Sequence, residues 1–322
     1  MELKKFPKLK DVKNSIAKLD RIGFPKFTKD IEVNLFVKRI EKILTEEFGV
    51  LYSPLYPFKH KEFSLKIFRV REVDTFTNIN LIREHSYPPI NITSMGRCNF
   101  PQFPVFYCSD DAMTALLEVV KNYGKSDKNY CISKWEILSP NENLIFQTFL
   151  QTELPPENHF GFFRKNLNER INEPFEKSLH KGLDKNRKEG LIEYLSFLDS
   201  SFIKDKEYSL SASLAYISLY ANHNYRTDIL MYPSVQKIFK GVNLALHPNF
   251  VENNLRLTRL YEVSLENYNP KNGKISITFY KYADVEKNVI MWKKVLPNDE
   301  NHIKTIKQDF GQIIKSEFKI RE

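Results

Sequence analysis

The segment from Pro104 to Tyr123 constrains the fold most, because a strand pattern there runs directly into a helix pattern. A short apolar run ends at Cys108 and is followed by Ser109-Asp110-Asp111, residue types that commonly cap helices. A helix is then expected from 112 to 123. A strand and a helix joined without a gap predict a chain in which helices pack on a sheet.

Similar patterns continue along the chain. Strands are expected at 65–70, 130–137, 143–149 and 228–232. Two β-rich runs between 255 and 282 flank an Asn-Gly pair that favours a hairpin. Helices are expected at 30–48, 303–318 and 209–221, the last with Ser209 as its N-cap, and the charged stretch 160–190 is interpreted as a largely helical surface insertion. The fold class expected from these elements is α+β.

Composition indicates a folded intracellular protein. The 322 residues can bury a substantial core, and 42% hydrophobic with 13% aromatic residues exclude a disordered chain. No apolar run approaches the roughly 20 residues of a membrane span. The three cysteines form no C-x-x-C pair. We therefore expect a cytoplasmic protein whose cysteines are reduced and mostly buried.

Several kinds of site are disfavoured because their motifs are missing. The glycines form neither G-x-G-x-x-G nor a phosphate-binding loop, which argues against Rossmann enzymes and P-loop NTPases. The seven histidines are scattered, so no zinc or iron site is expected, and each is interpreted as a surface or capping residue. The net charge of +9 leaves nucleic-acid binding open, although the basic residues follow no aromatic stacking pattern.

The residues best suited to chemistry lie between Gly96 and Glu118. Arg97 stands in a Gly-containing loop, and its guanidinium is a planar, bidentate donor for a diphosphate. Tyr107 lies near the end of the strand, where its ring can stack on nicotinamide or ribose. Glu118, in the following helix, can hydrogen-bond a ribose hydroxyl and stabilise an oxocarbenium-like transition state. Taken singly, each of these residues is more often structural, so the hypothesis depends on their pattern.

This pattern resembles the RES-domain family, whose members are NAD-degrading or ADP-ribosylating toxins of bacterial toxin–antitoxin pairs. Counterparts of the family's motifs follow in the family's order at Phe68-Arg69-Val70, Gly96-Arg97-Cys98-Asn99, Val105–Ser109, Ala115–Glu118, 229–235 and 241–246. Cys98 departs from the pattern, since it replaces an aromatic residue beside Arg97. The resemblance implies an ADP-ribosyltransferase-like fold with a mixed, bent β core.

The resemblance also implies the site. The implied catalytic residues are Arg97, Tyr107, Glu118 and Ser234. The implied NAD-binding residues are Arg69, Arg97, Asn99, Tyr107, Ser109 and Tyr232. Within these sets, Arg69 is an additional diphosphate or ribose contact, Asn99 fixes the loop, and Ser234 lies across the cleft from Glu118 to position the leaving group.

The expected organisation follows from where the resemblance falls. It predicts a helical extension over 1–62, a RES-like NAD-binding catalytic domain over 63–249 with an insertion at about 139–208, and a β-rich addition over 250–322 that ends in a helix. The additions have no assigned purpose.

Three functions are compatible with these residues. The first is an NAD glycohydrolase or phosphorylase that depletes NAD as a toxin or anti-phage effector, with NAD as substrate and no metal. The second is an ADP-ribosyltransferase acting on a protein or nucleic acid. The third is a non-catalytic module that binds nucleic acid or a partner protein. The sequence leaves open two kinds of partner, an antitoxin or regulatory protein and a second copy of the chain in a homodimer. No membrane contact is expected.

Overall fold

The computed structural model describes most of the chain. The described residues are 6–59, 65–120, 128–138, 143–149, 183–220, 227–234, 241–269, 274–296, 299–310 and 318–320, with scattered positions between 151 and 165. Helices and strands both contribute, so the predicted α+β class is confirmed. The chain forms two compact units, and each draws on three separate stretches of sequence.

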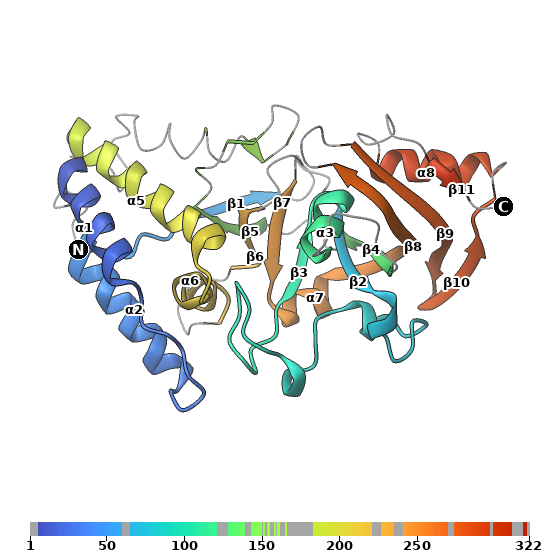
Figure 1. Cartoon of the computed structure of the whole chain (residues 1–322), viewed down its shortest axis with the longest axis horizontal. Coiled ribbons are helices and arrows are strands. Elements are labelled where there is room, and N and C mark those ends of the chain that lie inside the picture. The colour runs from blue at the N-terminus through green and yellow to red at the C-terminus, as the bar shows by residue number, and fades with distance from the viewer. Residues whose placement is uncertain are drawn as a thin grey trace. The chain divides into compact units, whose positions relative to one another are not determined.

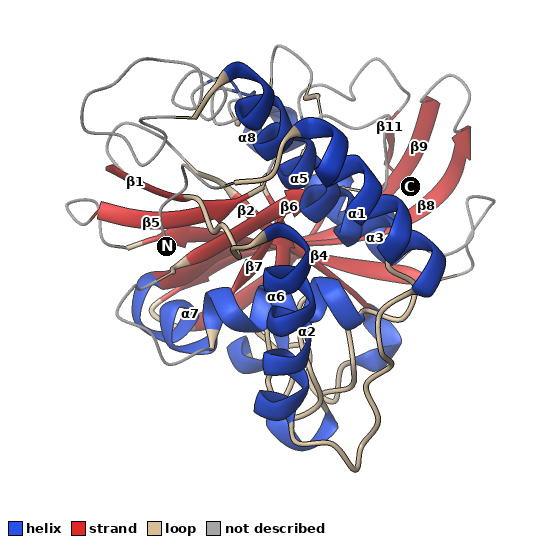
Figure 2. Ribbon diagram, turned by 90° about the vertical axis from the view of Figure 1, so that its left-hand side faces the viewer, coloured by secondary structure: helices blue, strands red, loops and turns tan. Residues whose placement is uncertain are grey.

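The first unit comprises residues 1–57, 90–104 and 145–233 and is mainly helical. Its helices are α1 (Leu9–Ile22), α2 (Val33–Phe48), α5 (Lys185–Lys204) and α6 (Ser209–Leu219), and its strands are β1 (Leu55–Lys59), β5 (Asn143–Thr148) and β6 (Ile229–Pro233). Strands β5 and β6 pair in parallel. Figure 2 shows α1 beside α5. Gly190 permits this approach, because a Cβ there would lie 2.8 Å from the Pro7 carbonyl oxygen.

The second unit comprises residues 58–89, 105–144 and 234–322 and is built on an antiparallel sheet. Its strands are β2 (Ile67–Glu72), β3 (Phe106–Ser109), β4 (Asn129–Ile137), β7 (Val242–Leu246), β8 (Leu255–Asn269), β9 (Lys274–Glu286) and β10 (Val289–Lys294), in the order β7-β3-β2-β4-β8-β9-β10. A short strand, β11 (Phe318–Ile320), pairs in parallel with β9.

Helices α3 (Ala112–Val119) and α8 (Glu300–Phe310) pack on one face of this sheet. Figure 1 shows α3 against β2 and β3. Their shared core includes Phe68 and Val70 of β2, Leu116 of α3 and Phe310 of α8. A third helix, α7 (Pro248–Asn254), joins β7 to β8 and is capped by His247, whose Nδ1 accepts from the Asn249 N–H.

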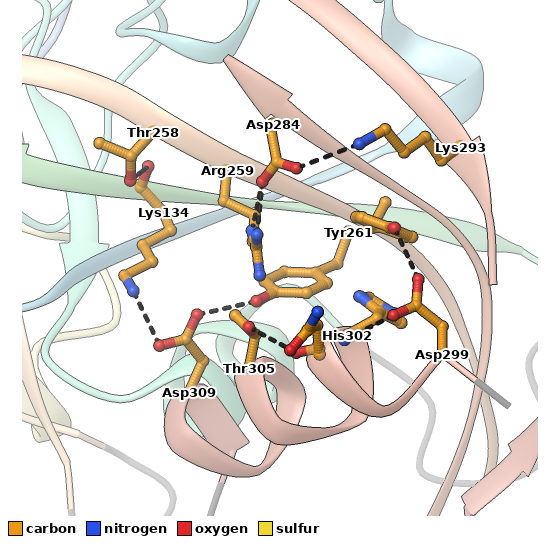
Figure 3. Close-up of polar contacts among 12 residues, drawn as sticks. Lys134, Thr258, Arg259, Tyr261, Asp284, Lys293, Asp299, His302, Thr305 and Asp309 are labelled. Atoms are coloured by element: carbon orange, nitrogen blue, oxygen red, sulfur yellow. Dashed lines mark hydrogen bonds and ion pairs between the residues drawn. The ribbon is translucent and has the colours of Figure 1, made fainter. Parts of the chain in front are cut away.

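A group of charged and aromatic side chains fastens α8 to the sheet (Figure 3). The carboxylate of Asp309 is fully buried, pairs with Lys134 Nζ at 2.9 Å and accepts from the Tyr261 hydroxyl at 2.8 Å. The imidazole of His302 stacks on Tyr282 with ring centroids 3.7 Å apart. Because its central carboxylate is enclosed and already satisfied, this group supports the fold of the second unit.

Most of the elements predicted from local patterns are confirmed. Helix α2 lies within the predicted 30–48, α3 begins at the predicted Ala112, and β2 to β6, β8 and β9 overlap their predicted ranges. The three cysteines are free and buried, as expected. The turn between β8 and β9 and most of the predicted insertion at 160–190 lie outside the described residues.

Two expectations are corrected. Ser209 is the first helical residue of α6 and not its N-cap, because Asp205 Oδ2 accepts from the Leu210 and Ser211 N–H groups at the start of this helix. His85 and His302 are buried core residues and not surface or capping residues.

Candidate active site around Glu118

Helix α3 presents Glu118 one residue before its C-terminal end. The helix begins at Ala112 because Asp111 caps it, with Oδ1 accepting from the N–H groups of Met113 at 3.1 Å and Thr114 at 2.7 Å. Every residue from Ala112 to Leu117 is buried, whereas Glu118 is only partly buried. The helix is therefore held rigidly while its only acidic side chain stays accessible.

Two donors hold one oxygen of this carboxylate. The Ser234 hydroxyl donates to Glu118 Oε1 at 2.6 Å, and the Asn243 amide Nδ2 donates to the same oxygen at 2.9 Å. Ser234 directly follows β6 in the chain, and Asn243 is the second residue of β7. The predicted neighbours Glu118 and Ser234 are thus brought together, across 116 positions of sequence.

Asn243 is a site residue that the sequence reasoning missed. It lies within the 241–246 segment that carries the family resemblance, but no role was assigned to it. Its neighbours in β7 are apolar, and the residue is 3% exposed. A buried amide needs hydrogen-bond partners. An asparagine within an apolar strand is therefore the sequence signal that indicates a specific polar contact at this position.

Gly241, the residue directly before β7, lies close to α3. A Cβ on this residue would lie 2.4 Å from Thr114 Oγ1, in the first turn of α3. The next residue, Val242, donates its N–H to Asp110 Oδ1 at 2.7 Å and accepts from the Ser109 hydroxyl at 2.7 Å. Ser109 is fully buried, so in this structure its hydroxyl ties β3 to β7.

Arg69 lies on the other face of the same sheet. Phe68 of β2 pairs with Ser109, and its side chain packs with α3. Because side chains alternate between the two faces of a strand, the next residue, Arg69, points away from that helix. Arg69 instead contacts the Phe106 ring, 5.3 Å from its centroid. The structure therefore does not place Arg69 beside Glu118.

The guanidinium of Arg69 has an unusual environment. Its Nη1 donates to the Tyr107 carbonyl oxygen at 2.9 Å, while its Nε is buried and has no partner. Among the described residues no carboxylate pairs with this cation. Burial lowers the pKa of Arg69 to about 10, which leaves the group charged at neutral pH.

Tyr107 shares the α3 face of the sheet with Asn243. Tyr107 pairs with Ala245 of β7, and directly paired residues of neighbouring strands point to the same face of a sheet. Ala245 is two residues beyond Asn243, and residues two apart on one strand also share a face. Its side chain is partly exposed. The ring is thus on the same sheet face as the carboxylate site of the second unit.

The remaining predicted site residues belong to the first unit. Arg97 and Cys98 form the tip of a tight turn closed by hydrogen bonds between the backbones of Gly96 and Asn99. The Asn99 amide donates to the carbonyl oxygens of Ser94 and Phe100, at 2.7 and 2.9 Å. Asn99 therefore fixes the loop from within.

Tyr232 has a structural environment in the first unit. It is 4% exposed, and its ring stacks on Phe202 with centroids 5.4 Å apart. Its predicted contact with NAD stays a prediction.

A cavity of about 810 Å³ lies in the first unit, between α1, the segment 22–26 and the C-terminal half of α5. The hydroxyls of Ser196, Ser200 and Ser201 in its wall donate to carbonyls of their own helix. Its charged residues are of both signs, and no predicted site residue lines it. The cavity therefore indicates no specific chemistry.

Neither a metal centre nor a membrane helix is found in the part of the chain that the structure describes. No three or more His, Cys, Asp or Glu side chains there are grouped to hold a metal ion. None of the helices there combines the length and apolar character needed to cross a membrane.

Comparison with known proteins identifies the segment that carries Glu118. The model of the RES domain family matches residues 67–131, which include β2, β3, α3 and the start of β4. The resemblance is thus confirmed for this segment, whereas the counterparts at 229–235 and 241–246 lie outside the match. RES domains are associated in general with NAD-related toxins. No curated protein and no solved structure matches the chain.

Proposed function

We propose that this protein cleaves the nicotinamide–ribose bond of NAD and thereby depletes NAD, as a hydrolase or a phosphorylase. The observation that carries the proposal is the Glu118 carboxylate, which Ser234 and Asn243 hold at 2.6 and 2.9 Å at the end of α3. A carboxylate fixed in this way stabilises the positive charge that develops on the ribose as nicotinamide departs.

The proposed reaction needs no further group in the bond-breaking step. The bond between ribose C1 and the nicotinamide nitrogen breaks, and both electrons leave with nicotinamide, which becomes neutral. The resulting oxocarbenium ion is stabilised by Glu118 and captured by an oxygen of water or phosphate. The oxygen that has attacked the ribose then loses its proton to solvent. The product is ADP-ribose when water attacks, or ADP-ribose-1″-phosphate when phosphate attacks.

Arg69 supports the choice of an anionic substrate. Its buried guanidinium has no carboxylate partner in the described residues, and a diphosphate would supply the missing negative charge. Arg69 lies on the opposite face of the sheet from Glu118, so its contact with NAD stays a prediction of the family resemblance and is separate from the Glu118 carboxylate.

Identification of the products tests this proposal. The purified chain is incubated with NAD, with and without phosphate, and the products are identified by mass. Nicotinamide with ADP-ribose indicates a hydrolase, and ADP-ribose-1″-phosphate indicates a phosphorylase. Transfer of ADP-ribose to an added protein or nucleic acid would replace the proposal by the transferase alternative. Unchanged NAD under all conditions would contradict both.

A further inference from the structure

We propose that Asn243 is a positioning residue for Glu118 and that β7 sets where α3 presents this carboxylate. The catalytic meaning of the inference rests on the proposed function, whereas the contact itself does not. Its basis is the asparagine amide inside a strand whose five residues are all buried. No water reaches such an amide easily, so its partner on Glu118 is a fixed part of the fold.

The contact has only one chemically consistent orientation. An ionised carboxylate can only accept hydrogen bonds, so the amide must present Nδ2 and not Oδ1 to Glu118. The Ser234 hydroxyl can rotate about its own bond to follow the carboxylate. The planar amide of Asn243 sits on a paired strand and cannot follow it in this way, so it is the donor that fixes the direction of Glu118.

The same strand also fixes the beginning of α3. Val242 donates to Asp110, directly before the capping residue of the helix, and Gly241 lies against Thr114 in its first turn. Side chains of a helix lean toward its N-terminus, so Glu118 reaches back along α3 toward β7. Consecutive residues of β7 therefore contact both the start of the helix and its functional side chain.

The donor character of Asn243 is open to a specific test. Asn243→Asp keeps the shape and replaces the donor by a second carboxylate close to Glu118. Two carboxylates this close do not both ionise readily, so one of them holds its proton to higher pH. Asn129→Asp is a matched control, because Asn129 donates to Glu262 at 3.1 Å between β4 and β8 of the same unit.

The experiment measures the pH dependence of kcat and KM for NAD cleavage in the wild type, Asn243→Asp, Asn243→Ala and Asn129→Asp. At pH 7 we expect kcat of both Asn243 variants to fall by about ten- to a hundred-fold with KM nearly unchanged. The acidic limb of the profile should move up by about one pH unit or more in Asn243→Asp alone. If Asn243→Asp keeps the wild-type kcat and its acidic limb does not move, the inference is overturned. If the Asp variant does not fold, kcat of Asn243→Ala decides, and a wild-type value there would overturn the inference.

A readout without activity separates this inference from the proposed function. The side-chain amide signals of Asn243 in a nitrogen–proton spectrum should shift, and their exchange with water should quicken, in Glu118→Ala. If the wild type leaves NAD intact while these signals respond, the proposed function fails and the positioning contact stands. Signals that do not respond would refute the contact, whatever the wild type does with NAD.

Discussion

Replacing Gly241 by alanine should destabilise the second unit through one identifiable clash. The added Cβ would lie 2.4 Å from Thr114 Oγ1 and 2.9 Å from both Asp110 Oδ1 and Asp111 Cβ. Thr114 is fully buried and its hydroxyl already bonds Asp111 at 3.0 Å, so it has no space to move into. Overpacking of this kind costs about 1–3 kcal/mol. Displacing β7 also strains the bond between Val242 and Asp110, and bonds to charged groups contribute about 1.5–3 kcal/mol.

We therefore expect the free energy of unfolding to fall by about 2–4 kcal/mol, and the melting temperature by about 4–16 °C for a unit of this size. Thermal unfolding followed by circular dichroism measures the effect. Gly161→Ala is the matched control, since nothing lies within 4 Å of a Cβ there. The double variant with Thr114→Ala should recover part of the loss. A Gly241→Ala protein that melts within about 1 °C of the wild type would refute the reasoning.

Three further expectations concern the site and the core. Ser234→Ala should lower kcat for NAD cleavage by about tenfold or more with the melting temperature kept, because a short bond to a carboxylate is lost; equal kcat would remove Ser234 from the site. Asp205→Ala should cost about 1–2 kcal/mol of unfolding free energy, since this residue caps α6; an unchanged urea midpoint would contradict that role. Burial lowers the pKa of His302 from 6.5 to about 4, so its contribution to stability is present above pH 6.5 and is lost as the pH falls toward 4. His302→Phe, which keeps the stack on Tyr282, should lose less stability than the wild type in that range, and parallel losses would contradict the assignment.

The strand, cap and helix around Glu118 could be predicted from the sequence because their determinants are local. Asp111 supplies the cap that starts α3, and the apolar run before it is long enough to form β3. The contact of Glu118 with Ser234 can be expected only from the family resemblance. No local pattern encodes it, because the two residues are 116 positions apart and meet through the fold.

Other features required the structure. Asn243 meets Glu118 across 125 positions, and this depends on β7 pairing with β3 and on the absence of a Cβ at Gly241. The burial of His302, a residue of α8 that stacks on Tyr282, follows from tertiary packing and has no signature in the surrounding sequence.

The rate of nicotinamide release by Glu118→Gln, compared with the wild type, tests the role of this carboxylate most directly. Glutamine nearly preserves the shape of the side chain and removes its charge, so the melting temperature should stay close to that of the wild type. We expect release of nicotinamide from NAD to fall by at least a hundred-fold, because the charge that stabilises the developing cation is gone. A folded Glu118→Gln protein that releases nicotinamide at the wild-type rate would show that Glu118 is not the catalytic carboxylate.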